Sequence, residues 1–158
     1  MTKVLIIGFG NPWRGDDDVG CDVARMLAAL YDDDPEVRVI SAHQLTPEMA
    51  EAVSASEFVL FLDAATGTHA GEIKHSTVAP RPGSMSFAHS LDPRLLLAAA
   101  DELYGSVPPA ELLTIVGACF EVGDCLSTAV IRQLPELFER AHEIVESHRH
   151  PAVRELVQ

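Results

Sequence analysis

Three consecutive aspartates, Asp16, Asp17 and Asp18, follow the first apolar segment of the chain and are the residues best suited to chemistry. Carboxylates bind divalent cations and act as general acids or bases. Each aspartate alone could simply cap a helix, but one cap needs only one side chain, so two are in surplus. Gly15 and Gly20 flank the run, as expected of a tight turn with close backbone approach. The loop of residues 8–20 is therefore predicted to be the functional centre and to help bind a metal.

The same loop contains Gly8-Phe9-Gly10, which invites a dinucleotide-binding interpretation. Two features oppose it. The third glycine of a G-x-G-x-x-G motif would fall at Trp13, whose ring is expected to keep the helix away from the strand. The aspartates would also repel a pyrophosphate, which binds a helix N-terminus because that end is positive. The same electrostatics favour a cation or a cationic substrate.

Asp63 and His89 are the residues chosen to complete a metal site with the aspartates. Asp63 ends a strongly apolar segment, where a buried carboxylate needs a cation or several hydrogen bonds. Its alternative role is to cap the turn that follows. His89 lies just ahead of a predicted helix, where a histidine can also be purely structural, and His43 ranks below it. Two carboxylates and an imidazole suit borderline divalent ions, and the sequence does not choose among Ni, Zn, Co and Mn.

Alternating strand and helix patterns predict how these residues are positioned. They indicate one α/β domain over residues 1–158, a three-layer α/β/α sandwich with a mostly parallel five-stranded sheet and helices on both faces. In such sheets ligands bind beyond the carboxyl ends of the strands, where Asp16, Asp17 and Asp63 fall. The predicted strands are residues 4–8, 37–41, 57–63, 71–78 and 112–118, the fourth lying near an edge. The predicted helices begin near Asp17 or Asp18, at a Thr46 cap, at Asp92 and within residues 124–127, and Pro135 should bend or divide the last one.

Composition excludes several classes of protein. The chain has 24 acidic and 11 basic residues, a formal charge of −13, which argues against nucleic acid because phosphates need clustered Lys and Arg. No apolar run approaches the ~18 residues of a membrane helix, and a cytoplasmic location is predicted. Cysteines at 21, 119 and 125 form an odd set without CxxC spacing, which predicts buried, reduced thiols rather than disulfides or a zinc knuckle.

The motifs together resemble those of the hydrogenase maturation protease family. Residues 4–11 and 15–20 resemble its opening signature, G-x-G-N followed by D-D/E-x-x-G. Leu62-Asp63-Ala64 matches the second signature, His89-Ser90-Leu91 resembles the third, and residues 113–117 resemble the last core strand. Residues 43–48 resemble a stretch found in members that serve cytoplasmic, soluble hydrogenases. Phe120-Glu121 departs from the loop of some members. The resemblance covers nearly the whole chain in the right order.

The resemblance implies an endopeptidase that removes the C-terminal extension of a nickel–iron hydrogenase large-subunit precursor after nickel insertion. Asp17, Asp63 and His89 match the family's metal ligands, and Asp16 matches an adjacent carboxylate that could act as a base on water. Asp16, Asp17 and Asp63 are thus the expected catalytic residues. Nickel is expected to arrive with the precursor, and the protein is expected to be a monomer.

Two other functions use the same predicted ligands. One is a nickel-binding chaperone or sensor without peptidase activity. The other is an ordinary metallohydrolase of small molecules, which should retain about one metal ion per chain. No Ser/His/Asp set or reactive Cys/His set is apparent in the sequence, so covalent catalysis is not expected.

Overall fold

The computed structural model describes residues 1–81, 91–123 and 125–151 of the chain. The predicted order of five strands and four helices is confirmed, with a short 3-10 helix, η1, added before the first α-helix. The elements are β1 (Thr2–Phe9), η1 (Gly15–Asp18), α1 (Val19–Leu30), β2 (Val37–Ala42), α2 (Met49–Ser54), β3 (Ser56–Ala65), β4 (Ile73–Val78), α3 (Pro93–Tyr104), β5 (Ala110–Val116) and α4 (Thr128–Arg149).

The five strands form one sheet in the order β2-β1-β3-β5-β4. All neighbouring pairs are parallel except β4 with β5, so the predicted mostly parallel sheet is confirmed. β4 lies at an edge, as its alternating polar pattern indicates. The chain leaves β1 for β2 on one side, and β3 lies on the other side of β1. The carboxyl ends of β1 and β3 therefore flank a topological switch point, where ligands bind in open α/β sheets.

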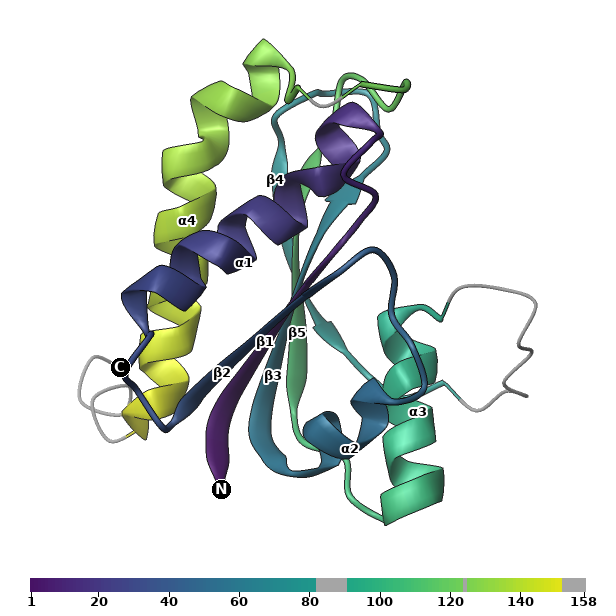
Figure 1. The fold of residues 1–158 in the computed structure, drawn as a ribbon, viewed down its shortest axis with the longest axis vertical. Helices are drawn as coiled ribbons and strands as arrows, with labels where there is room; N and C mark the ends of the chain where they lie inside the picture. The colour runs from purple at the N-terminus through teal and green to yellow at the C-terminus, as the bar shows by residue number, and fades with distance from the viewer. Residues whose placement is uncertain (82–90, 124, 152–158) are drawn as a thin grey trace.

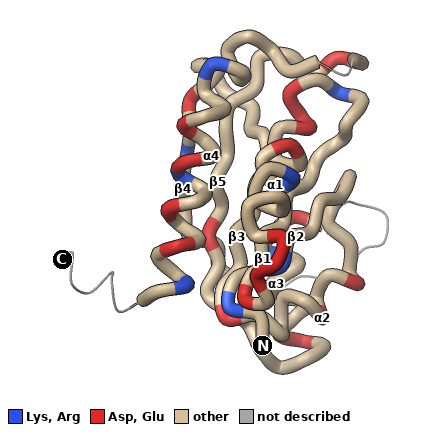
Figure 2. The backbone as a smooth tube through the Cα atoms, turned by 60° about the vertical axis from the view of Figure 1, so that its left-hand side comes forward, with Lys and Arg blue, Asp and Glu red and all other residues tan. Residues whose placement is uncertain are grey.

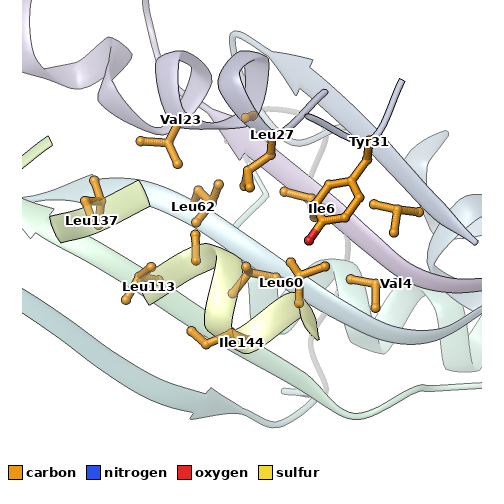
Figure 3. Close-up of a cluster of buried hydrophobic side chains, with 14 of the residues drawn as sticks. Val4, Ile6, Val23, Leu27, Tyr31, Leu60, Leu62, Leu113, Leu137 and Ile144 are labelled. Carbon is orange, nitrogen blue, oxygen red and sulfur yellow. The ribbon is translucent and has the colours of Figure 1, made fainter. Parts of the chain in front are cut away.

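Helices cover both faces of the sheet, which confirms the three-layer sandwich. Helices α1 and α4 pack on one face, and α2 and α3 on the other (Figure 1). Side chains along β1 alternate between the two cores: Val4 and Ile6 face α1 and α4, whereas Leu5 and Ile7 face α2 and α3. A strand buried on both faces is expected to be continuously apolar, as β1 is. Figure 3 shows the first core, where Val23 and Leu27 of α1 and Leu137 and Ile144 of α4 meet Ile6, Leu60, Leu62 and Leu113 of the sheet.

One prediction about a helix start was wrong. The helix expected to start with a Thr46 cap begins at Met49 and has no side-chain cap, because residues 46–49 first form a turn closed by a 3.1 Å bond from Met49 N to Thr46 O. Of the two effects predicted for Pro135, a bend or a division of the helix, the division does not occur, since Pro135 lies inside the continuous helix α4. The start of α3 is confirmed, since Asp92 accepts a hydrogen bond from Leu95 N at 2.8 Å. No helix in the described ranges is long and apolar enough to cross a membrane.

Candidate functional site

Glycines allow η1 and α1 to lie directly against the ends of β1 and β3. A Cβ atom added to Gly8 would lie 2.3 Å from the carbonyl oxygen of Gly20, and one added to Gly20 would lie 2.3 Å from that of Leu62. These distances are too short for any side chain, so backbone meets backbone at both places. Trp13, by contrast, is 65% exposed and does not separate the helix from the strand. In a dinucleotide-binding motif the third glycine, here at the position of Trp13, permits close contact between helix and strand. In this protein Gly20 permits that contact instead.

The three aspartates of η1 have three different partners. Asp17 Oδ2 accepts a hydrogen bond of 2.7 Å from the backbone N–H of Asn11. Asp18 pairs with Arg25 at 3.6 Å. Asp16 is turned toward the loop between β5 and α4. Neither η1 nor α1 has a side-chain cap, so the capping alternative does not explain the run.

Asp16 is fully buried and saturated with hydrogen bonds. Its Oδ2 accepts from Ala118 N at 2.7 Å and Cys119 N at 3.0 Å, and its Oδ1 accepts from Ser127 N at 2.7 Å. Burial acts to raise the pKa of this carboxyl, but the hydrogen bonds, led by those from Ser127, outweigh it, and the pKa lies below its usual value. A side chain with no exposed surface cannot meet a substrate. The predicted role of Asp16 as a catalytic base therefore does not fit its surroundings.

Asp63 lies within β3, two residues before the strand ends at Ala65, and so it does not cap a turn there. Its Oδ1 accepts a hydrogen bond of 2.8 Å from Ala64 N. Burial raises the pKa of Asp63 to about 7, and the negative charge of Asp17 adds to the rise, while the bond from Ala64 opposes it. Ionised Asp63 is thus costly at this position.

Asp17 and Asp63 line the same pocket, which has a volume of about 470 Å³. The pocket lies at the switch point, beyond β1 and β3, where the sequence predicted a ligand site. Its other wall comes from the segment after β2, which contributes His43 and Gln44. That segment is anchored by a backbone bridge between Leu45 and Leu91. The full lining is Phe9, Gly10, Asn11, Asp17, His43, Gln44, Leu45, Asp63 and Leu91.

The structure therefore brings two of the three predicted ligands together. The third, His89, falls outside the described residues. Among the residues that the structure does describe, no group of three or more His, Cys, Asp or Glu side chains is arranged to hold a metal ion. The sequence gives His43 a weaker signal than His89, and it gives none for Gln44, which shares no recognisable ligand spacing with the aspartates.

The cysteines differ in part from the prediction. Cys21 is buried, and its thiol lies 3.3 Å from the carbonyl oxygen of Ala42. Burial, with a smaller contribution from the charge of Asp18, raises the pKa of this thiol to about 11, so it is a poor nucleophile. Cys119 and Cys125 are exposed rather than buried, because both belong to the loop between β5 and α4 instead of the core.

Solved structures of known proteins share this fold. Neither a protein-family model nor a curated protein matches the chain. A crystal structure of the NiFe hydrogenase maturation protease HycI from Thermococcus kodakarensis KOD1 superposes with a TM-score of 0.72 and 25% identity, covering 92% of this chain and 93% of that one. The chain shares the fold of this hydrogenase maturation protease over nearly its whole length. The family resemblance predicted from the motifs is therefore confirmed.

Other solved hydrogenase maturation proteases share the fold at lower identity. The hydrogenase maturating endopeptidase HybD from E. coli has a TM-score of 0.70 and 16% identity, covering 92% of this chain and 93% of that one. NiFe hydrogenase maturation protease HybD from Thermococcus kodakarensis has a TM-score of 0.70 and 20% identity, covering 90% and 99%. The shared fold thus extends over nearly the whole of each chain.

Proposed function

We propose that this protein is a hydrogenase maturation protease, an endopeptidase that removes the C-terminal extension from a nickel–iron hydrogenase large-subunit precursor after nickel insertion. One observation carries the proposal: the carboxylates of Asp17 and Asp63 line one pocket at the switch point of a fold shared with hydrogenase maturation proteases. A monomeric state and a cytoplasmic location are part of the same proposal.

In this proposal nickel is part of the substrate. Asp17, Asp63 and His89 complete the coordination of a nickel ion that the precursor already holds through its own ligands. The pKa of Asp63 supports this role, because a cation beside Asp63 and Asp17 would offset the cost of their neighbouring charges. Carboxylate and imidazole ligands also suit nickel.

The bound nickel would position the scissile peptide beside the two carboxylates. Water adds to the peptide carbonyl carbon, the C–N bond breaks, and the proton from water ends on the leaving amine. The nickel can polarise the carbonyl, and Asp17 or Asp63 can accept the proton from water. Asp16 takes no part in this transfer because it is enclosed by backbone N–H groups.

A cleavage assay with purified precursor tests the proposal. Wild-type protein is expected to shorten nickel-loaded precursor and to leave nickel-free precursor intact, as measured by mass spectrometry. Asp17→Asn should abolish shortening while the protein stays folded. Asp18→Asn is the matched control, because Asp18 pairs with Arg25 and lies outside the pocket lining. Binding of nickel-loaded precursor without shortening would instead support a chaperone or sensor, and an active Asp17→Asn variant would overturn the ligand assignment.

A further inference from the structure

Asp16 lies at the centre of a seam between η1 and the loop that connects β5 to α4. The three N–H groups that its carboxylate accepts are 102, 103 and 111 residues further along the chain. They belong to Ala118 and Cys119 at the start of the loop and to Ser127 at its end. One side chain therefore holds both ends of this loop, and Figure 1 shows η1 beside the connection at one end of the molecule.

Backbone hydrogen bonds extend the same seam on both sides of Asp16. Asp16 N donates to Cys119 O at 2.9 Å, and Gly15 N donates to Gly123 O at 2.9 Å. Gly123 N donates in turn to Trp13 O at 2.8 Å. Backbone hydrogen bonds thus link the β5–α4 loop to η1 and to the segment before it. Asp16 is the one side chain of η1 that bonds to this loop in the described structure.

Asp17 is the next residue of this four-residue helix, and its carboxylate bonds to Asn11 and lines the pocket instead of bonding to the loop. Its direction depends on how η1 is held, because η1 is too short to be stable without outside contacts. We infer that Asp16 is the positioning residue of the site, which fixes η1 against the β5–α4 loop so that Asp17 faces the pocket. The catalytic meaning of this inference rests on the proposed function, whereas its structural content does not.

A carboxylate is the side chain that this seam requires. Its two oxygens accept three N–H bonds on a side chain with no exposed surface, and charged acceptors form the stronger hydrogen bonds. An asparagine of the same shape has only one acceptor oxygen, and its NH₂ group would face at least one of these N–H donors. A buried donor left without an acceptor is destabilising, so Asp16→Asn should open the seam.

Amide hydrogen exchange followed by NMR tests the inference without any substrate. The informative probe is the N–H of Asn11, which bonds to Asp17 rather than to Asp16. If Asp16 holds Asp17 in place, Asp16→Asn should speed exchange at Asn11 at least about tenfold, together with exchange at Ala118, Cys119 and Ser127. Asp18→Asn is the control and should leave all four amides near their wild-type rates. Unchanged exchange at Asn11 in Asp16→Asn would overturn the inference.

Wild-type protein supplies a second measurement should Asp16→Asn fail to fold. The inference then predicts that the amides of Asn11, Ala118, Cys119 and Ser127 open as one unit with a common opening equilibrium. Independent opening of Asn11 would contradict it.

The cleavage assay adds a functional readout. Turnover per folded molecule should fall about 10-fold to 100-fold in Asp16→Asn, because displaced ligands lose catalysis, whereas a merely structural role would lower the melting temperature and leave this turnover unchanged. If the wild type does not cleave the precursor, the proposed function fails, and hydrogen exchange still decides the role of Asp16.

Discussion

The carboxyl of Asp63 makes the stability of this protein depend on pH. Its pKa is raised to about 7 by burial and by Asp17, so the folded state prefers the protonated form. In the unfolded chain the Asp63 carboxyl has the ordinary aspartate pKa of about 3.9. The free energy of unfolding therefore decreases as the pH rises from about 4 to about 7, and the full destabilisation is present above that range.

Replacing Asp63 by asparagine should remove this cost. Asp63→Asn is expected to be more stable than wild type by about 1 kcal/mol near pH 8, a modest value because the side chain keeps part of its hydration. The gain should shrink to nearly zero near pH 4. Urea unfolding at several pH values measures it, and a gain that does not change with pH would contradict the prediction.

Gly20 is a second residue whose replacement has a defined outcome. The Cβ of Gly20→Ala would lie 2.3 Å from the carbonyl oxygen of Leu62, so α1 must move away from β3. The expected loss is at least about 2 kcal/mol in the free energy of unfolding. Gly123→Ala is the matched control, because a Cβ there meets nothing within 4 Å and should change stability little. Equal stability of the two variants would show that the close contact is not needed.

Helix α4 illustrates a conflict between local preference and packing. Pro135 cannot donate a backbone hydrogen bond, yet the helix continues past it because Val130, Leu137, Ala141 and Val145 are buried against the sheet and α1. Packing on both sides of the proline thus outweighs its local cost. The sequence alone gives the cost but not the packing that opposes it.

Pro135→Ala should accordingly stabilise the protein. Pro135 is exposed, and its replacement restores one backbone bond and removes a clash, for an expected gain of about 1–3 kcal/mol in urea unfolding. Pro93→Ala is the control, since proline is tolerated in the first turn of α3 and no comparable gain is expected. A Pro135→Ala variant no more stable than wild type would refute this explanation.

Elements could be predicted from the sequence because their signals are local. The apolar run of β1 and the Asp92 cap of α3 both lie within a few residues of the features they specify. The role of Asp16 could not be predicted, because its donors are backbone N–H groups more than 100 residues away, and every residue except proline has one. The proximity of Asp17 and Asp63 could be predicted only from the rule that the carboxyl ends of parallel strands meet at the same edge of the sheet.

The charge of the whole molecule is strongly negative, and it is spread over the surface. Figure 2 shows acidic positions along the length of α4, which include the exposed Glu136, Glu139 and Glu143. A net charge of −13 on 158 residues disfavours the compact state through self-repulsion. Dissolved salt screens charges that are more than about 10 Å apart at 0.1 M.

Moderate salt should therefore stabilise the protein. Raising sodium chloride from about 0.02 M to about 0.3 M is expected to raise the melting temperature by about 2–5 °C, as followed by circular dichroism. All samples should have the same pH and contain no glycerol, so that only the salt concentration differs between them. A melting temperature that falls with added salt would mean that individual ion pairs, such as that of Arg149 with Glu146, outweigh the net repulsion.

Because β1 lies in the middle of the sheet, its packing is completed late in synthesis. β1 is the first of the described strands to leave the ribosome, yet it lies between β2 and β3, and one of its faces is covered by α1 and α4. Val4 and Ile6 stay without their complete cover until Val145 has been made. Pairing across such long separations is slow, and uncovered apolar strands aggregate. The nascent chain thus depends on α4, the last of the described helices, to complete the cover of β1, and release before α4 is made should give an insoluble product.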